Sequence, residues 1–259
     1  MIYGYLHQGS GIGNQLFRYI ATRIKAQDLG TDWRMIYQPD NSGKVQGFKA
    51  KDFIHFDENK IIYSPPDYVP IWNEKKVVEG GIDIRSYDPE FNFIEGNVVI
   101  DGEFQDERYW EYREKEVNEW LKVKYLEVPN NTCVIGFRGG EFSNFPDLFL
   151  AKEYWNDAIL AALNAFPEIG AFQVHTDDRG LAKEFFPSCE IISDPEINWR
   201  SMRYAKCAII ANSSFYILPR WLRQGGIDSP FTISPRYWAR RNTKTWALPS
   251  NYYKRFTYI

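Results

Sequence analysis

The chain has 259 residues, 44% of them hydrophobic, which is enough for one large domain or two small ones with a packed core. Acidic and basic residues are well mixed and give a formal net charge of −3, so the chain lacks the basic patch that nucleic-acid binding normally requires. No apolar run approaches the roughly 18 residues of a membrane-spanning helix, and the N-terminus has no signal-peptide pattern, so we expect no membrane insertion.

The first half of the chain contains one clear amphipathic helix among strand-like runs. The expected elements are a strand at 2–6, a helix from 14 to about 27, short strands FIHF, IIYS and KVV within 31–95, a strand at 98–104 and a helix from about 106 to 123. Gly30 is expected to end the first helix, because glycine readily adopts the left-handed conformation found there. The polar segment EVPNN near residue 128 predicts the end of an N-terminal α/β domain over 1–128.

The second half alternates strands and helices regularly. The expected elements are strands at 132–138, 171–176, 190–193, 207–211 and 231–234, and helices at 152–166, 179–186, around 198–205 and around Trp221. Strands separated by helices predict βαβ units and a parallel sheet. Residues 129–259 are therefore expected to form a Rossmann-like domain.

A candidate phosphate site lies in the segment KCAIIANSSF at 206–215. An apolar strand runs here into the polar turn Asn212-Ser213-Ser214, which opens a helix. Hydroxyls and unpaired backbone N–H groups at a helix start attract anions. Because ligands of open α/β sheets bind at the carboxyl ends of the strands, this turn predicts a nucleotide-diphosphate site.

Two further strand ends carry charged residues. Arg138 follows the strand at 132–138 and precedes two glycines, which suits a bidentate grip on phosphate oxygens; the alternative is an ion pair with Glu141 or another carboxylate. Asp177 and Asp178 follow the strand at 171–176, where they could bind a cation, but we favour capping a helix or contacting a nucleotide.

The turn GSGIGNQ at 9–15 can let a ligand approach the backbone at a helix N-terminus, or can serve as a tight turn alone. It is no dinucleotide fingerprint, because Asn14 stands where that motif needs glycine. The three histidines, His7, His55 and His175, show no metal-ligand spacing and are interpreted as ordinary surface or core residues.

The three cysteines, Cys133, Cys189 and Cys207, are too few and too scattered for a disulfide framework or a zinc cluster. Two of them lie inside apolar strand-like runs. We interpret them as reduced core residues of a cytoplasmic protein.

Taken together, the motifs resemble those of the α-1,2-fucosyltransferase family, glycosyltransferase family 11, which uses GDP-fucose. The segments that carry the resemblance, in chain order, are GIGNQLFRYIATRIKA at 11–26, DGEFQDERYW at 101–110, FRGGEF at 137–142, FQVHTDD at 172–178, KCAIIANSSF at 206–215 and TISPRYW at 232–238. The resemblance implies a GT-B-like fold, with two Rossmann-like domains and the active cleft between them.

The resemblance also implies the reaction, an inverting transfer of fucose from GDP-fucose to a glycan hydroxyl without a metal ion. Arg138 matches the first arginine of the family's H-x-R-R-x-D motif, and a carboxylate, Glu141 or Asp147, is the expected general base. The implied donor-binding residues are Gly11, Gly13, Asn14, Gln15, Asp177, Asp178, Asn198, Asn212, Ser213 and Ser214. The expected partners are a nucleotide sugar and a glycan acceptor, with no cofactor.

Several positions depart from the family pattern. Gly136, Gly139 and Glu141 replace the histidine, the second arginine and the aspartate of the arginine motif, and Asn198 replaces an aspartate that helps to hold the nucleotide. Two alternatives therefore stay open: an enzyme of the same fold with another nucleotide-sugar donor, and a weakened homologue that only binds nucleotide or glycan. The sequence indicates neither the acceptor nor the oligomeric state.

Overall fold

The computed structural model describes residues 1–37, 47–79, 82–222, 231–239 and 253–259. The chain divides into two compact units, Met1–Lys122 and Val123–Ile259, where the sequence analysis placed the boundary near residue 128. We call them unit 1 and unit 2 and describe each by itself.

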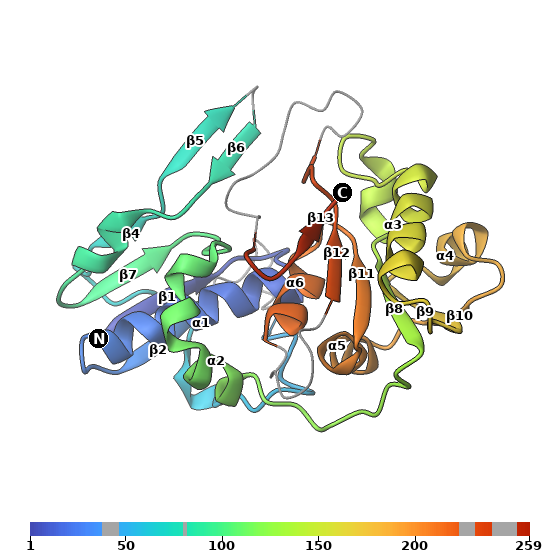
Figure 1. The fold of residues 1–259 in the computed structure, drawn as a ribbon. Helices are drawn as coiled ribbons and strands as arrows, with labels where there is room; N and C mark the ends of the chain where they lie inside the picture. Colours follow the sequence, from blue (N-terminus) through green and yellow to red (C-terminus); the bar gives the residue numbers. More distant parts are fainter. Residues whose placement is uncertain (38–46, 80–81, 223–230, 240–252) are drawn as a thin grey trace. The chain divides into compact units, whose positions relative to one another are not determined.

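Unit 1 contains a five-stranded parallel sheet with the strand order β3-β2-β1-β7-β4. Its strands are β1 (Ile2–Leu6), β2 (Trp33–Tyr37), β3 (Ile61–Ile62), β4 (Ile71–Asn73) and β7 (Val98–Asp101). Helix α1 (Ile12–Asp28) joins β1 to β2 and packs against both, as Figure 1 shows. A separate antiparallel hairpin pairs β5 (Lys76–Glu79) with β6 (Ile82–Arg85).

Helix α1 forms where its apolar spacing predicts it. Leu16, Ile20 and Ile24 recur every four residues and are fully buried against the sheet. At its end, Gly30 has a φ of 59°, its N–H donates to the carbonyl of Gln27, and the N–H of Thr31 donates to the carbonyl of Ala26 at 2.9 Å. This is a Schellman motif, so Gly30 ends the helix as expected.

Two expectations for unit 1 are wrong. Residues 106–123 form two short 3₁₀ turns, Glu107–Tyr109 and Glu111–Arg113, and then α2 (Glu114–Trp120) instead of one helix. The chain leaves helical geometry at Trp110, whose φ is −145°, and both Trp110 and its neighbour Tyr109 are thereby fully buried.

The segment FIHF at 53–56 is the end of a turn followed by irregular chain, and not a strand. Its apolar residues serve a different contact, since the ring of Phe56 stacks on Phe48 at 4.2 Å and both pack on Tyr19 of α1. The strands β2, β4 and β6 were not predicted.

Unit 2 contains a six-stranded parallel sheet with the order β10-β9-β8-β11-β12-β13. Its strands are β8 (Thr132–Phe137), β9 (Ala171–Thr176), β10 (Glu190–Ile192), β11 (Cys207–Ile210), β12 (Phe231–Ser234) and β13 (Thr257–Tyr258). Its helices are α3 (Lys152–Ala165), α4 (Arg179–Phe185), α5 (Pro195–Tyr204) and α6 (Ser214–Trp221).

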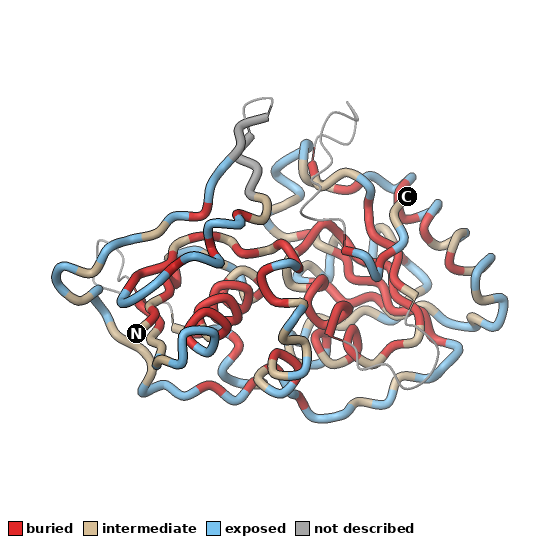
Figure 2. The backbone as a smooth tube through the Cα atoms, turned by 60° about the vertical axis from the view of Figure 1, so that its left-hand side comes forward, coloured by how far each residue is buried: buried red, intermediate tan, exposed pale blue. Residues whose placement is uncertain are grey.

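The helices of unit 2 cover both faces of its sheet. Figure 1 shows α3 and α4 on one face, with α5 and α6 on the other. The central strands β8 and β11 are buried along their whole length, which explains their continuous apolar sequences. Figure 2 shows the buried segments of the backbone in red. The expected α/β class with two Rossmann-like parallel sheets is confirmed.

Each sheet contains a topological switch point. In unit 2 the chain winds from β8 to β9 and β10 on one side, and then to β11 and β12 on the other. In unit 1 it winds from β1 to β2 and β3 on one side, while β7 and β4 lie on the other. Ligands of open α/β sheets bind at the carboxyl ends of the two strands at such a reversal, which are β8 and β11 in unit 2 and β1 and β7 in unit 1.

Candidate functional site

The charged and hydroxyl residues predicted for unit 2 gather at the carboxyl edge of its sheet. Arg138 follows β8, Asp177 follows β9, and the turn Asn212–Ser214 follows β11. These three strands are adjacent, because β9 and β11 both pair with β8 in parallel register. Arg138 and the Asn212–Ser214 turn therefore lie on the two sides of the switch point between β8 and β11.

Arg138 is held by two carboxylates. Its Nη1 donates to Asp177 Oδ2, and its Nη2 donates to Glu141 Oε1 at 3.0 Å. The arginine lies 5.0 Å above the ring of Phe142 and keeps 26% of its side chain exposed. The ion pair that was the alternative to a phosphate role is thus present, while part of the guanidinium still faces solvent.

The two proposed bases differ in their surroundings. Glu141 belongs to the 3₁₀ turn Gly140–Asn144, is 70% exposed and bonds Arg138. Asp147 is exposed in the turn that follows. Neither carboxylate is buried.

Glycine is required after Arg138 because the loop approaches the Asp177–Asp178 segment closely. A Cβ at Gly139 would lie 2.7 Å from the Cβ of Asp178, and one at Gly140 would lie 2.6 Å from Asp177 Oδ2. The backbone N–H of Gly139 donates to Asp177 Oδ1 at 2.9 Å. No side chain fits at position 139, which explains why the second arginine of the resembled motif is missing.

Gly136 has a similar steric reason. A Cβ there would lie 2.8 Å from the ring of Tyr216, which is 2% exposed. The hydroxyl of Tyr216 lies 3.1 Å from the carbonyl of Phe137 and 2.9 Å from that of His175, so it bonds the ends of β8 and β9, and burial raises its pKa. The aromatic ring occupies the space that a histidine at 136 would need.

The start of α6 leaves backbone donors unused. Ser213 is the N-cap residue, but its hydroxyl makes no capping bond. Its carbonyl accepts the N–H groups of Tyr216 and Ile217, while the N–H groups of Ser214 and Phe215 have no acceptor among the described residues. The helix N-terminus is therefore available to an anion.

The buried side chain of Asn212 connects this turn to neighbouring loops. It is 1% exposed, and its Nδ2 donates to the carbonyl oxygens of Leu148, at 2.9 Å, and Trp238. Its Oδ1 is buried without a hydrogen-bond partner among the described residues. Its amide fixes the turn in place.

Asp178 and Asn198 serve the fold of unit 2. The carboxylate of Asp178 caps α4 by accepting the N–H of Leu181 at 3.0 Å, one of the two roles expected for it. Asn198 is 4% exposed, and its Oδ1 lies 2.8 Å from Nδ1 of His175. Burial lowers the pKa of His175 from 6.5 to about 4, so this ring is neutral at physiological pH.

The turn GSGIGNQ lies in unit 1, at the carboxyl end of β1. Gly11 is exposed and caps α1 without a side-chain bond, Gly13 is buried, and no acidic residue occupies the first turn. The Oδ1 of Asn14 accepts a bond from Gln105 at 3.1 Å. Gln15 is fully buried, and its Oε1 accepts the N–H of Lys49 at 2.9 Å, so its amide fixes the segment around residue 49.

The sequence analysis missed a histidine–aspartate pair in unit 1. His7 follows β1 and Asp101 ends β7, and His7 Nε2 lies 2.7 Å from Asp101 Oδ1. The two side chains are 37% and 24% exposed. Both residues lie at the carboxyl ends of strands that pair in parallel, and this position is the signal that indicates the pair, whereas metal-ligand spacing along the chain does not.

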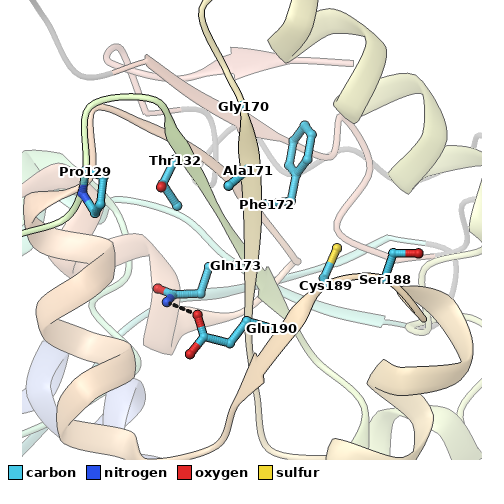
Figure 3. A pocket seen from close by; sticks show the side chains of 9 residues that line it. All are labelled: Pro129, Thr132, Gly170, Ala171, Phe172, Gln173, Ser188, Cys189 and Glu190. Atoms are coloured by element: carbon cyan, nitrogen blue, oxygen red, sulfur yellow. Dashed lines mark hydrogen bonds between the residues drawn. The ribbon is translucent and has the colours of Figure 1, made fainter.

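One pocket lies away from these residues. Figure 3 shows it at the amino-terminal ends of β8, β9 and β10, where Gln173 Nε2 donates to Glu190 Oε2 at 2.8 Å. Its volume is 520 Å³, and Cys189 lines it with a thiol whose pKa is raised by burial. It lies at the edge of the sheet opposite to the switch-point residues.

Two features are absent from the described part of the chain. No group of three or more histidine, cysteine, aspartate or glutamate side chains there could hold a metal ion. Among the helices of that part, none has the length and apolar character needed to span a bilayer.

No family model and no curated protein matches the chain. Among solved structures it is similar to POFUT1 in its apo form, with 11% identity over 85% of this chain and 93% of that chain and a TM-score of 0.42. It is also similar to E. coli heptosyltransferase WaaC with ADP (11% identity, 92% and 88% covered, TM-score 0.45) and to POFUT1 in complex with GDP (10%, 86% and 94%, 0.41).

Proposed function

We propose that the chain is a GT-B-like glycosyltransferase that transfers fucose from GDP-fucose to a glycan hydroxyl with inversion and without a metal ion. One observation carries the proposal: Arg138 and the uncapped start of α6 lie on either side of the switch point of the unit 2 sheet. A guanidinium and a helix N-terminus at this edge form a site suited to a diphosphate.

The chemistry of the transfer explains why such a site would be catalytic. As the sugar leaves, negative charge develops on the diphosphate, and donors that are already in position stabilise it. The N–H groups of Ser214 and Phe215, the hydroxyl of Ser213 and the guanidinium of Arg138 supply these donors. Loss of one such donor typically costs about 3–4 kcal/mol in the transition state.

The two carboxylates on Arg138 have different roles in this proposal. Asp177 fixes both the guanidinium and the N–H of Gly139, so it positions the loop. Glu141 forms a surface pair with 70% of its side chain exposed, and such pairs contribute little to stability. A phosphate oxygen can therefore replace Glu141 on the arginine at low cost.

The preference for GDP-fucose rests on the resemblance of the motifs. Asn198, which replaces the family's aspartate, bonds the buried His175. Binding of the nucleotide base therefore depends on other groups. We propose unit 2 as the nucleotide-sugar domain and unit 1 as the acceptor domain. Another nucleotide-sugar donor is the second candidate.

Thermal unfolding of the purified chain with GDP, GDP-fucose, UDP and CMP, without added metal, tests the proposal. A ligand that binds only the native state at about 100 times its Kd stabilises it by about 2.7 kcal/mol. We expect GDP and GDP-fucose to raise the melting temperature, and Arg138→Ala to remove the increase.

Arg34→Ala is the matched control, because it removes the same charge from β2 of unit 1. A rise in melting temperature with UDP alone would mean that the donor is a UDP-sugar and not GDP-fucose. No rise with any of the nucleotides would refute the proposal of a nucleotide-sugar transferase. A response to GDP that persists in Arg138→Ala would refute the proposed phosphate site.

A further inference from the structure

Two buried thiols lie side by side in the sheet of unit 2. Cys133 of β8 and Cys207 of β11 are direct partners in the register of these two parallel strands. Paired residues of neighbouring strands project from the same face of a sheet, and the thiol of Cys133 donates its hydrogen to the sulfur of Cys207 at 3.4 Å. Both cysteines lie at the amino-terminal ends of their strands, away from Arg138 and the start of α6.

The backbone already places these two cysteines where a disulfide can form. Neighbouring strands are about 4.8 Å apart, and the Cα atoms of a disulfide are usually about 4.4–6.8 Å apart. Rotation of the two side chains is therefore enough to bring the sulfur atoms into bonding distance, and both strands keep their hydrogen bonds. Cys189, the third cysteine, precedes the edge strand β10, which is two strands away from β8.

The surroundings favour a thiolate on Cys207. The hydrogen bond from Cys133 and the positive charge of Arg220 lower the pKa of Cys207, although burial acts in the opposite direction. Lys206 and Glu168, which pair with each other at 2.8 Å, act on this pKa in opposite directions. The hydrogen bond to Cys207, together with burial, raises the pKa of Cys133. Cys207 is therefore the nucleophilic sulfur of the pair, and Cys133 keeps its proton.

The backbone around Cys207 holds Arg220 in place. Arg220 is 1% exposed, its Nη1 donates to the carbonyl of Ala205 at 2.8 Å, and its Nη2 donates to that of Phe231 at 3.1 Å. Ala205 precedes Cys207 by two residues, and Phe231 is the register partner of Cys207 on β12. The guanidinium thus stays near the thiolate in the folded chain.

We infer that Cys133 and Cys207 form an oxidisable dithiol, which a hydroperoxide converts into a disulfide between β8 and β11. This inference about unit 2 does not depend on the proposed function. Cys207 reacts first, because it is 2% exposed at the start of its strand, whereas Cys133 is fully buried.

The reaction with hydrogen peroxide balances in two steps. The thiolate sulfur of Cys207 attacks one peroxide oxygen, the O–O bond breaks, and the other oxygen leaves as hydroxide, which takes up a proton to become water. The sulfur of Cys133 then attacks the sulfenic acid on Cys207, forms the S–S bond and releases a second water. The two thiols lose two electrons in total, and these reduce the peroxide.

Peptide mapping of the full chain tests the inference, because the three cysteines fall in different tryptic peptides, 125–138, 184–200 and 207–220. The folded chain is treated with hydrogen peroxide, the remaining thiols are blocked with N-ethylmaleimide during unfolding, and the chain is digested without reductant. We expect peptides 125–138 and 207–220 to be joined and peptide 184–200 to carry the blocking group. Dithiothreitol should separate the joined peptides.

Variants of the cysteines test the order of the two steps. In Cys133→Ala the sulfenic acid on Cys207 has no thiol beside it, so dimedone should label peptide 207–220. Cys207→Ala should give no dimedone label on peptide 125–138, because the thiol of Cys133 keeps its proton. Cys189→Ala is the matched control, and it should form the disulfide at the rate of the full chain.

Two results for the full chain would overturn the inference, and both apply even where a variant fails to fold. One is that peptides 125–138 and 207–220 stay separate at every peroxide concentration up to the one that oxidises methionine. The other is a disulfide that includes Cys189. A Cys133→Ala chain that folds but gives no dimedone label on peptide 207–220 would overturn the role of Cys207 as the nucleophile.

Discussion

Protonation of the buried His175 should make this protein less stable in mild acid. The ring is fully buried in β9, with Nδ1 at 2.8 Å from Asn198 Oδ1 and Nε2 at 2.9 Å from Gln173 Oε1. Burial lowers its pKa from 6.5 to about 4, and the hydrogen bond to Asn198 and the charge of Glu190 offset only part of this effect. The folded chain therefore keeps the ring neutral at pH values where the unfolded chain protonates it.

The sign and size follow from linkage. The folded pKa is below the unfolded one, so His175 contributes its full stability above pH 6.5, and this contribution is lost as the pH falls towards about 4. Each unit between the two pKa values corresponds to about 1.4 kcal/mol in the free energy of unfolding, so His175 contributes about 3 kcal/mol in total. Below pH 4 the loss levels off.

The assay combines two measurements on the full chain. The chain has three histidines, so NMR titration resolves few imidazole signals, and His175→Gln assigns one of them. Urea midpoints of the wild-type chain and His175→Gln are then compared between pH 7.5 and 4.5, where only the wild-type chain should lose the additional stability. Asn198→Asp should remove the effect, because a carboxylate beside Nδ1 favours the charged ring.

A folded-state pKa of His175 at or above 6.5 would refute this reasoning. Parallel urea midpoints for the wild-type chain and His175→Gln over the whole range would do so too, because the pH dependence would then come from other groups.

The remaining predictions concern three glycines of unit 2. Gly136→Ala should destabilise the chain by about 1–3 kcal/mol, because its Cβ meets the Tyr216 ring at 2.8 Å; chemical denaturation should show the loss, and Tyr216→Leu in the same chain should recover part of it. Gly139→Ala should weaken the thermal response to GDP, because its Cβ displaces the Arg138 loop from Asp178, whereas Gly180→Ala within α4 should keep the response and add about 0.5–1 kcal/mol of stability.

Local sequence signals were sufficient for most of unit 2. Strand β9 has the predicted bounds Ala171–Thr176, and β8 and β11 lie within their predicted ranges, because buried parallel strands are short apolar runs between helices. The helix around 198–205 begins earlier, at Pro195, because Asp194 caps it by accepting the N–H of Ile197 at 2.8 Å.

Unit 1 shows where such signals fail. Tyr109 and Trp110 are residues of the kind that an amphipathic helix buries. In the folded chain they are buried where helical geometry is interrupted, between two 3₁₀ turns. Phe56 of FIHF packs on Tyr19 of α1 from irregular chain, and a short apolar run alone does not distinguish that arrangement from a strand. In both cases a tertiary contact overrides the local pattern.

The candidate sites show the same division between local and tertiary information. Residues that follow single strands, such as Arg138 and Ser213, are recognisable from the strand–turn–helix pattern around each of them. The contacts of His7 depend on a partner 94 residues away, and only the order β2-β1-β7 of the folded sheet brings the two together. Because each sheet reverses its order beside its first strand, the residues that follow β1 and β8 lie at the ligand-binding edge in both units.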